Sequence, residues 1–220
     1  MTTLTTNPCA GVLARLWAEA EASDARLHEW TDALPPGERA ELMAGAEDFR
    51  GFYGRLKDFH LAVSRSTASL LYILARSCRA KAIIEFGTSF GVSTLHLAAA
   101  LRDNGGGRLI GTELEATKAE RARGNVAAAG LGDLVEIRHG DALETLAGGL
   151  PQFVDLVLLD GAKSLYPRVL SMLQARLRAG SLVVADNADR CAEYLARVRD
   201  PAGGFVTVPF AGDVELSMRL

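Results

Sequence analysis

From Lys81 onward, short apolar runs alternate with segments of helical periodicity, and this alternation restricts the chain to few folds. Such a pattern is typical of βαβ units, in which parallel strands are joined by helices that cover both faces of a sheet. We therefore predict an α/β fold with a doubly wound, mostly parallel sheet of seven strands. The expected strands are Ala82–Phe86, Arg108–Thr112, Val135–Arg138, Val154–Leu159 and Leu182–Ala185, followed by an antiparallel hairpin of Phe205–Val208 and Val214–Met218.

Helical periodicity fills the remaining segments of the chain. Between and after the strands we expect helices at Val92–Arg102, Glu115–Ala129, Leu143–Ala147, Tyr166–Arg178 and Ala188–Val198. The first eighty residues indicate helices alone, at Pro8–Trp30, after Pro35-Pro36-Gly37 through Met43, and at Ser64–Ser77. Glycines at 51 and 54 predict that Phe49–Phe59 is irregular. We expect one domain, 1–220, in which residues 1–80 form a helical cap on a core of residues 81–220.

Composition excludes several classes of protein. A net charge of −3 and a pI of about 5.8 do not indicate a nucleic-acid-binding surface. No run of eighteen apolar residues is present, so we expect no membrane span, and the first eight residues do not resemble a signal peptide. Three widely spaced cysteines, Cys9, Cys78 and Cys191, predict reduced thiols in a cytoplasmic protein.

The first predicted strand ends in a loop, Glu85–Gly91, that leads directly into a helix. Gly87 and Gly91 allow a tight turn and a close approach to a ligand, although a plain strand-to-helix turn also favours glycine. The loop lacks the middle glycine of the dinucleotide motif G-x-G-x-x-G. It spells the G-x-S-x-G of hydrolases, but that fold needs a histidine late in the chain, and the last one, His139, follows the third strand.

A third interpretation of the loop is S-adenosylmethionine, which carries a sulfonium, an amino acid end, a ribose and an adenine but no phosphate. Carboxylates at successive strand ends suit such a ligand. Glu85 lies beside the loop, Glu113 follows the second strand near the expected ribose, and Asp141 with Ala142 follows the third near the adenine. Each acid alone is also compatible with a solvated loop residue, but the three together favour the cofactor.

Strands four and five also end in polar side chains, Asp160 after the fourth and Asp186 with Asn187 after the fifth. Neighbouring strand ends lie about 5 Å apart, so these groups converge into an all-oxygen set that suits a hard cation such as Mg²⁺. Lys163 is placed to act as a base at the same mouth. The plainer alternatives are a helix cap for Asn187, a cofactor contact without metal for Asp160 and a surface position for Lys163.

These stretches together resemble the cation-dependent O-methyltransferases related to catechol and caffeoyl-coenzyme A O-methyltransferases, including their small bacterial members. The element Asp160-x-x-Lys163, with Asp186-Asn187 after the next strand, is fairly specific to that family, and the resemblance covers about residues 60–220. It implies a Rossmann-like class I methyltransferase fold, S-adenosylmethionine with a divalent cation as cofactors, and a homodimer.

The resemblance also implies a role for each matching residue. The methionine end of the cofactor would be lined by Glu85, Gly87, Thr88, Ser89, Gly91 and Ser93. Further cofactor contacts would come from Val63, Glu113, Asp141, Ala142 and Asp160. The metal ligands would be Asp160, Asp186 and Asn187, and the catalytic residues would be Asp160 and, as general base, Lys163.

Two departures from catechol-type enzymes argue against a catechol preference. Those enzymes carry an aromatic gatekeeper inside the Asp-x-x-Lys element, where this chain has Gly161-Ala162. They also place a glutamate before the final hairpin, and the connection Pro209–Gly212 lacks one. We expect methyl transfer to a hydroxyl of a small molecule, with no role for membranes or nucleic acid. The alternatives are a metal-independent methyltransferase acting on N, C or RNA, and a non-catalytic module that binds the cofactor.

Overall fold

The computed structural model describes residues 1–38 and 49–220, and its centre is a seven-stranded mixed sheet in the order β3-β2-β1-β4-β5-β7-β6. The strands are β1 Ala82–Phe86, β2 Arg108–Glu113, β3 Val135–His139, β4 Val154–Leu159, β5 Leu177–Ala185, β6 Phe205–Phe210 and β7 Val214–Arg219. The first five are parallel, whereas β7 runs antiparallel to both β5 and β6. This arrangement confirms the predicted doubly wound sheet with its C-terminal hairpin.

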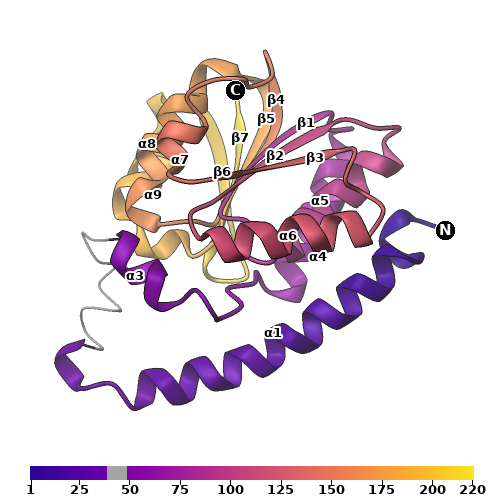
Figure 1. The fold of residues 1–220 in the computed structure, drawn as a ribbon. Helices are drawn as coiled ribbons and strands as arrows, with labels where there is room; N and C mark the ends of the chain where they lie inside the picture. Colours follow the sequence, from indigo (N-terminus) through magenta and orange to yellow (C-terminus); the bar gives the residue numbers. More distant parts are fainter. Residues whose placement is uncertain (39–48) are drawn as a thin grey trace.

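The helices form a layer on each face of the sheet (Figure 1). One face carries α4 Arg65–Ser77, α5 Val92–Asp103 and α6 Ala116–Ala128, and the other carries α7 Ala142–Thr145, α8 Tyr166–Leu173 and α9 Ala192–Arg199. The long helix α1 Cys9–Asp32 packs along α5 and α6, and the short helix α3 is Phe49–Arg55. Short 3-10 turns are η1 Thr3–Thr5, η2 Lys163–Leu165, η3 Gln174–Arg176, η4 Ala188–Arg190 and η5 Pro201–Gly203.

The central strand β1 explains where a ligand would bind. Its neighbours are β2 on one side and β4 on the other, with Glu85 in register with Gly111 and Leu158. The chain therefore builds outward from β1 to β3 and then returns to the opposite side of β1 to form β4. In open α/β sheets, ligands bind outside the carboxyl ends of the strands at such a reversal. The reversal lies between β1 and β4.

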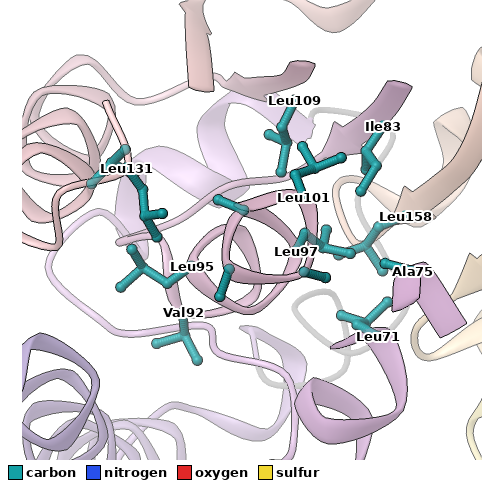
Figure 2. Close-up of a cluster of buried hydrophobic side chains, with 14 of the residues drawn as sticks. Leu71, Ala75, Ile83, Val92, Leu95, Leu97, Leu101, Leu109, Leu131 and Leu158 are labelled. Atoms are coloured by element: carbon teal, nitrogen blue, oxygen red, sulfur yellow. The ribbon is translucent and has the colours of Figure 1, made fainter. Parts of the chain in front are cut away.

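Apolar side chains between the sheet and its helices make the core. Figure 2 shows the cluster around α5, in which Val92, Leu95, Leu97 and Leu101 of α5 lie beside Leu71 and Ala75 of α4, Ile83 of β1, Leu109 of β2, Leu158 of β4 and Leu131. Removing one such leucine side chain from water contributes roughly 1.5–3 kcal/mol. Both faces of β1 and β4 are covered, which is why those strands are almost continuously apolar.

Strand β5 is longer than the sequence pattern predicted, and α8 is correspondingly shorter. The predicted helix to Arg178 ends at Leu173, a 3-10 turn follows, and the strand begins at Leu177 instead of Leu182. An irregularity in the β4–β5 register accounts for the difference. Ser181 Oγ there accepts from the Arg178 N–H at 3.0 Å and donates to the Val154 carbonyl at 2.7 Å.

The segment Phe49–Phe59 was predicted to be irregular, and the first part of that prediction is wrong. Residues Phe49–Arg55 form α3 despite Gly51 and Gly54. Phe49 and Tyr53 are four residues apart and so lie on one side of the helix, where both face the site described below. Tertiary packing of this face offsets the low helix propensity of the glycines.

Other N-terminal predictions have mixed outcomes. Helices α1 and α4 agree with the predicted ones to within two residues at each end, and the predicted helix ending at Met43 falls mostly outside the described residues. None of the described helices is long and apolar enough to cross a membrane. Within the described chain, Cys9, Cys78 and Cys191 are free thiols, as expected.

Candidate active site

Two adjoining spaces open at the carboxyl ends of the strands, where the chain reverses. The inner pocket lies over β1, β2 and β4, and its lining includes Gly87, Ser89, Glu113, Asp141, Ala142 and Asp160. The outer cavity is about 850 Å³ and lies between α1, α3 and the ends of β4 and β5. Its polar wall consists of Asp160, Lys163, Asp186, Asn187 and Asp213. Asp160 lines both spaces, so the two meet at the end of β4.

The loop after β1 is shaped by the close passage of β4. Gly87 has φ +97°, and a Cβ there would lie 2.4 Å from the carbonyl oxygen of Asp160. Only glycine fits this position, because both the backbone conformation and the space exclude a side chain. Ser89 also has a positive φ, of 48°, and Gly91 at φ +95° precedes α5. The turn therefore brings the backbone of the loop to the floor of the inner pocket.

Glu85 supports this loop from beneath. Its buried carboxylate accepts hydrogen bonds from Thr88 Oγ1 at 3.0 Å, Ser93 Oγ at 2.6 Å and Thr94 Oγ1 at 2.6 Å. Burial raises the pKa of Glu85 to about 7, and these three hydroxyl groups oppose the rise. The predicted residues Glu85, Thr88 and Ser93 thus form one buried network that holds the loop, and the loop backbone lies between them and the inner pocket.

Glu113 and Lys118 form the charged side of the inner pocket. Glu113 accepts from the backbone N–H groups of Ser89 at 2.7 Å and Glu115 at 2.9 Å, which ties the ends of β1 and β2 together. Burial raises the pKa of Glu113, and the same effect lowers the pKa of the buried Lys118. Sequence reasoning identified Glu113 at a strand end but missed Lys118, which lies inside a helix and gave no signal of its own.

Asp141 lies where the third strand leads into α7. Its carboxylate accepts from the Leu143 N–H at 2.9 Å as a helix cap and pairs with Arg50 of α3 at 2.8 Å. Burial alone would raise the pKa of Asp141, but these partners outweigh it and lower the pKa. Ala142 is buried beside it and also lines the inner pocket. The predicted pair at the third strand end therefore does reach the inner pocket.

The acids after β4 and β5 are held side by side by the backbone. The Asp160 N–H donates to the Phe86 carbonyl at 2.7 Å, and the Asp186 N–H donates to the Leu159 carbonyl at 2.9 Å. Lys163 Nζ lies 3.0 Å from Asp160 Oδ1, with both side chains largely shielded from solvent. Burial and then the charge of Asp160 raise the pKa of Asp186 to about 7, while Lys163 opposes the rise.

Asn187 and Asp213 complete the polar wall. Asn187 has a left-handed backbone with φ +48°, which redirects the chain at the end of β5. The Ala188 N–H donates to the Asp213 carbonyl at 2.7 Å, and Asn187 Nδ2 donates to Asp213 Oδ2 at 3.4 Å. Sequence reasoning missed Asp213, although its place in the tight hairpin turn after Gly212 was visible. The hairpin folds back over the ends of β4 and β5 and brings a further carboxylate to the site.

The side chains at the ends of β4 and β5 have the chemical character of ligands for a hard divalent cation. Asp160, Asp186 and Asn187 offer oxygen atoms only, the ligand type that Mg²⁺ prefers. After burial, the charges of Asp160 and Asp213 are further causes of the raised pKa of Asp186. The polar wall thus carries three carboxyl groups and one lysine, Lys163. Within the described residues, no group of three or more His, Cys, Asp and Glu side chains is arranged to hold a metal.

Five predicted cofactor residues lie outside the two pocket linings: Glu85, Thr88 and Ser93, which belong to the buried network under the loop, and Val63 and Gly91. Val63 is buried just before α4, while its neighbour Leu61 lines both spaces. Gly91 ends the loop, where a Cβ would contact Ala122 at 3.7 Å, so its role is to start α5. These positions shape the backbone around the site.

Comparison with known proteins finds similar sequences for part of the chain. Residues 84–188, from β1 to just past Asn187, match the family model of a methyltransferase domain. Two curated relatives, both named catechol O-methyltransferase, are from Niastella koreensis, at 37% identity over 61% of this chain, and from Mycobacterium tuberculosis, at 35% over 64%. The matched regions span 62% and 63% of those relatives' own lengths.

Solved structures extend the likeness beyond this methyltransferase domain. An O-methyltransferase from Streptomyces achromogenes involved in tomaymycin synthesis, solved with S-adenosylmethionine, is 28% identical with a TM-score of 0.63, covering 81% of this chain and 88% of its own. An O-methyltransferase from Bacillus cereus is 21% identical with a TM-score of 0.67, and the match covers 88% of this chain and 96% of that one. At this identity the two proteins are similar in fold. The predicted resemblance to this O-methyltransferase family is confirmed.

Proposed function

We propose that the chain is an S-adenosylmethionine-dependent O-methyltransferase that moves a methyl group to a hydroxyl of a small molecule, assisted by a divalent metal. One observation carries the proposal. Asp160 lies at the junction of the inner pocket and the outer cavity, with Lys163 Nζ 3.0 Å from its carboxylate. A methyl group can pass only where a donor site and an acceptor site meet, and here that junction carries both an acid and a base.

The inner pocket is the proposed cofactor site. Its glycine loop brings backbone groups to the pocket, and its charged groups include Glu113 and Asp141. Glu113 would hold the ribose hydroxyls, Asp141 with Ala142 would face the adenine, and Ser89 would lie beside the methionine end. S-adenosylmethionine supplies the methyl group, and transfer leaves S-adenosylhomocysteine.

Asp160, Asp186 and Asn187 would hold Mg²⁺ at the wall of the outer cavity. When bound, this metal would supply Lewis-acid chemistry that makes an acceptor hydroxyl easier to deprotonate. Lys163, in its deprotonated amine form, would take the hydroxyl proton and pass it to solvent, and the surrounding side chains would orient the acceptor oxygen in line with the methyl carbon. No covalent bond between acceptor and protein is required.

A phenol is the proposed acceptor. The two curated relatives named catechol O-methyltransferase support it, and the outer cavity falls in the range of roughly 300–1,000 Å³ typical of small-molecule sites. We further propose, from the family resemblance, that the chain acts as a homodimer and that residues 1–80 cap the core of 81–220 in one domain. Light scattering of the purified protein measures the oligomeric state directly.

The test is a methyl-transfer assay with methyl-labelled S-adenosylmethionine, catechol and caffeic acid, in Mg²⁺ and in EDTA. The proposal predicts labelled phenol in Mg²⁺ and loss of the product in EDTA. Equal transfer in EDTA, with little loss in Asp186→Asn, would favour the metal-independent alternative. Cofactor binding without transfer to any hydroxyl, nitrogen or carbon acceptor would favour a non-catalytic module.

A further inference from the structure

Helix α3 places three aromatic side chains around the site. Phe49, Phe52 and Tyr53 line the outer cavity, and Phe49 and Tyr53 line the inner pocket as well. The rings of Phe52 and Tyr53 pack edge to face with centroids 5.1 Å apart. Aromatic side chains offer large apolar surfaces on which another flat ring packs favourably. This face of α3 therefore borders both the donor and the acceptor space.

Tyr53 is tied to the loop that follows β4. Its hydroxyl donates a hydrogen bond to the carbonyl oxygen of Gly161 at 3.1 Å. A side chain at Gly161 is excluded, because a Cβ there would lie 2.5 Å from the ring of Phe86. The next residue, Ala162, adds only a methyl group. The tether thus holds an aromatic ring against a loop that has almost no side-chain surface of its own.

The surroundings of the Tyr53 hydroxyl agree with a position between the two spaces. Burial raises its pKa well above the usual value, and Asp160 and Glu113 raise it further, while Arg190 opposes them. Asp160 belongs to the proposed metal and acceptor side, and Glu113 belongs to the proposed cofactor side. The protonated hydroxyl accordingly remains a donor to Gly161, and the ring stays at the junction.

We propose that Tyr53 is a specificity-determining residue whose tethered ring forms the wall on which a flat aromatic acceptor lies while its hydroxyl faces Asp160 and Lys163. Helix α3 thereby supplies the aromatic surface that the Gly161–Ala162 loop lacks. This inference rests on the proposed function and adds to it the residue that would recognise the ring of the proposed phenol. It also explains why a short helix with two glycines is ordered next to the site.

The test compares Tyr53→Ala and Tyr53→Phe with a matched control, Tyr72→Phe. Tyr72 is a half-buried tyrosine of α4 whose hydroxyl bonds Asp103 at 2.7 Å, and it lines neither space. Steady-state rates are measured with catechol and caffeic acid in Mg²⁺, and cofactor affinity is measured by calorimetry. We expect Tyr53→Ala to raise the phenol KM about tenfold, with the cofactor Kd within about threefold and a cooperative melting transition that shows the variant is folded at the assay temperature.

Tyr53→Phe keeps the ring and should hold the phenol KM within about twofold, and Tyr72→Phe should match the wild type. A wild type that binds no S-adenosylmethionine would overturn the proposed function itself. A wild type that binds the cofactor but methylates neither phenol would overturn the aromatic wall alone. The aromatic wall would also be overturned if Tyr53→Ala left the phenol KM unchanged. It would be overturned as well if the loss of phenol affinity were matched by equal losses of stability and of cofactor affinity.

Discussion

Replacement of Gly87 by alanine tests how closely β4 passes the cofactor loop. The added Cβ would lie 2.4 Å from the Asp160 carbonyl oxygen and 2.8 Å from the Gly161 nitrogen, both of them backbone atoms that cannot rotate away. A non-glycine residue with a left-handed backbone costs about 1–2 kcal/mol, and forced overpacking costs about 1–3 kcal/mol. Together they predict a loss of about 2–5 kcal/mol in the free energy of unfolding.

The assay is urea unfolding of wild type, Gly87→Ala and the control Gly124→Ala. Gly124 lies inside α6, where a Cβ would meet nothing within 4 Å, so alanine should stabilise the protein by up to about 1 kcal/mol. Because Gly87→Ala also pushes on Asp160, it should weaken S-adenosylmethionine binding. A Gly87→Ala protein as stable as the wild type, with unchanged cofactor affinity, would refute the close approach of β1 and β4.

Three further predictions concern the charged groups. First, burial raises the pKa of Glu85 to about 7, so the folded state binds its proton more tightly than the unfolded state does, and the contribution of Glu85 to stability is largest below about pH 4.5 and falls as the pH rises to about 7. Glu85→Gln should reduce that fall by roughly 2–3 kcal/mol, as measured by urea unfolding across this range, while Asp186 continues to contribute in the same sense. Second, Lys163→Met should lower kcat about 10²- to 10⁴-fold with the cofactor Kd unchanged. Third, Asp213→Asn should weaken Mn²⁺ binding, followed by electron paramagnetic resonance, about three- to tenfold, because it removes one negative charge beside Asp186.

Each of the three predictions on Glu85, Lys163 and Asp213 would be contradicted by a specific result. A pH profile in Glu85→Gln that equals the wild type would show that the buried carboxyl does not titrate in this range. Near-normal turnover by Lys163→Met would remove the lysine from the proton transfer. For Asp213→Asn, the control is Asp58→Asn, an exposed acid paired with Lys57 outside both spaces. Equal Mn²⁺ affinities of the two variants would contradict a role for Asp213.

The sequence predicted those parts of the site that depend on strand ends. Because parallel strands end at one edge, recognising each strand was enough to bring Glu113, Asp141, Asp160 and Asp186 to a common region. The same local reasoning placed Glu85 at the loop but not its three hydroxyl partners, since their convergence depends on the first turn of α5. The doubly wound sheet and its C-terminal hairpin followed from periodicity in the same way.

Residues that reach the site through tertiary packing were not predictable. Tyr53 bonds Gly161, 108 positions away in the chain, and its helix carries glycines that indicate irregular structure. Asp213 belongs to a hairpin turn whose folding back over β5 is set by β7 pairing, not by local pattern. The early start of β5 likewise depends on Ser181 bonding across to Val154, a contact that periodicity does not encode.

The central claim is that the inner pocket binds S-adenosylmethionine through the acid at the end of β2. Calorimetric titration of S-adenosylmethionine into the wild type and into Glu113→Ala tests it most directly. We predict one cofactor per chain in the wild type and at least about tenfold weaker binding in the variant, since paired hydrogen bonds to a carboxylate are lost. Absence of binding to the wild type, or equal binding to both proteins, would contradict it.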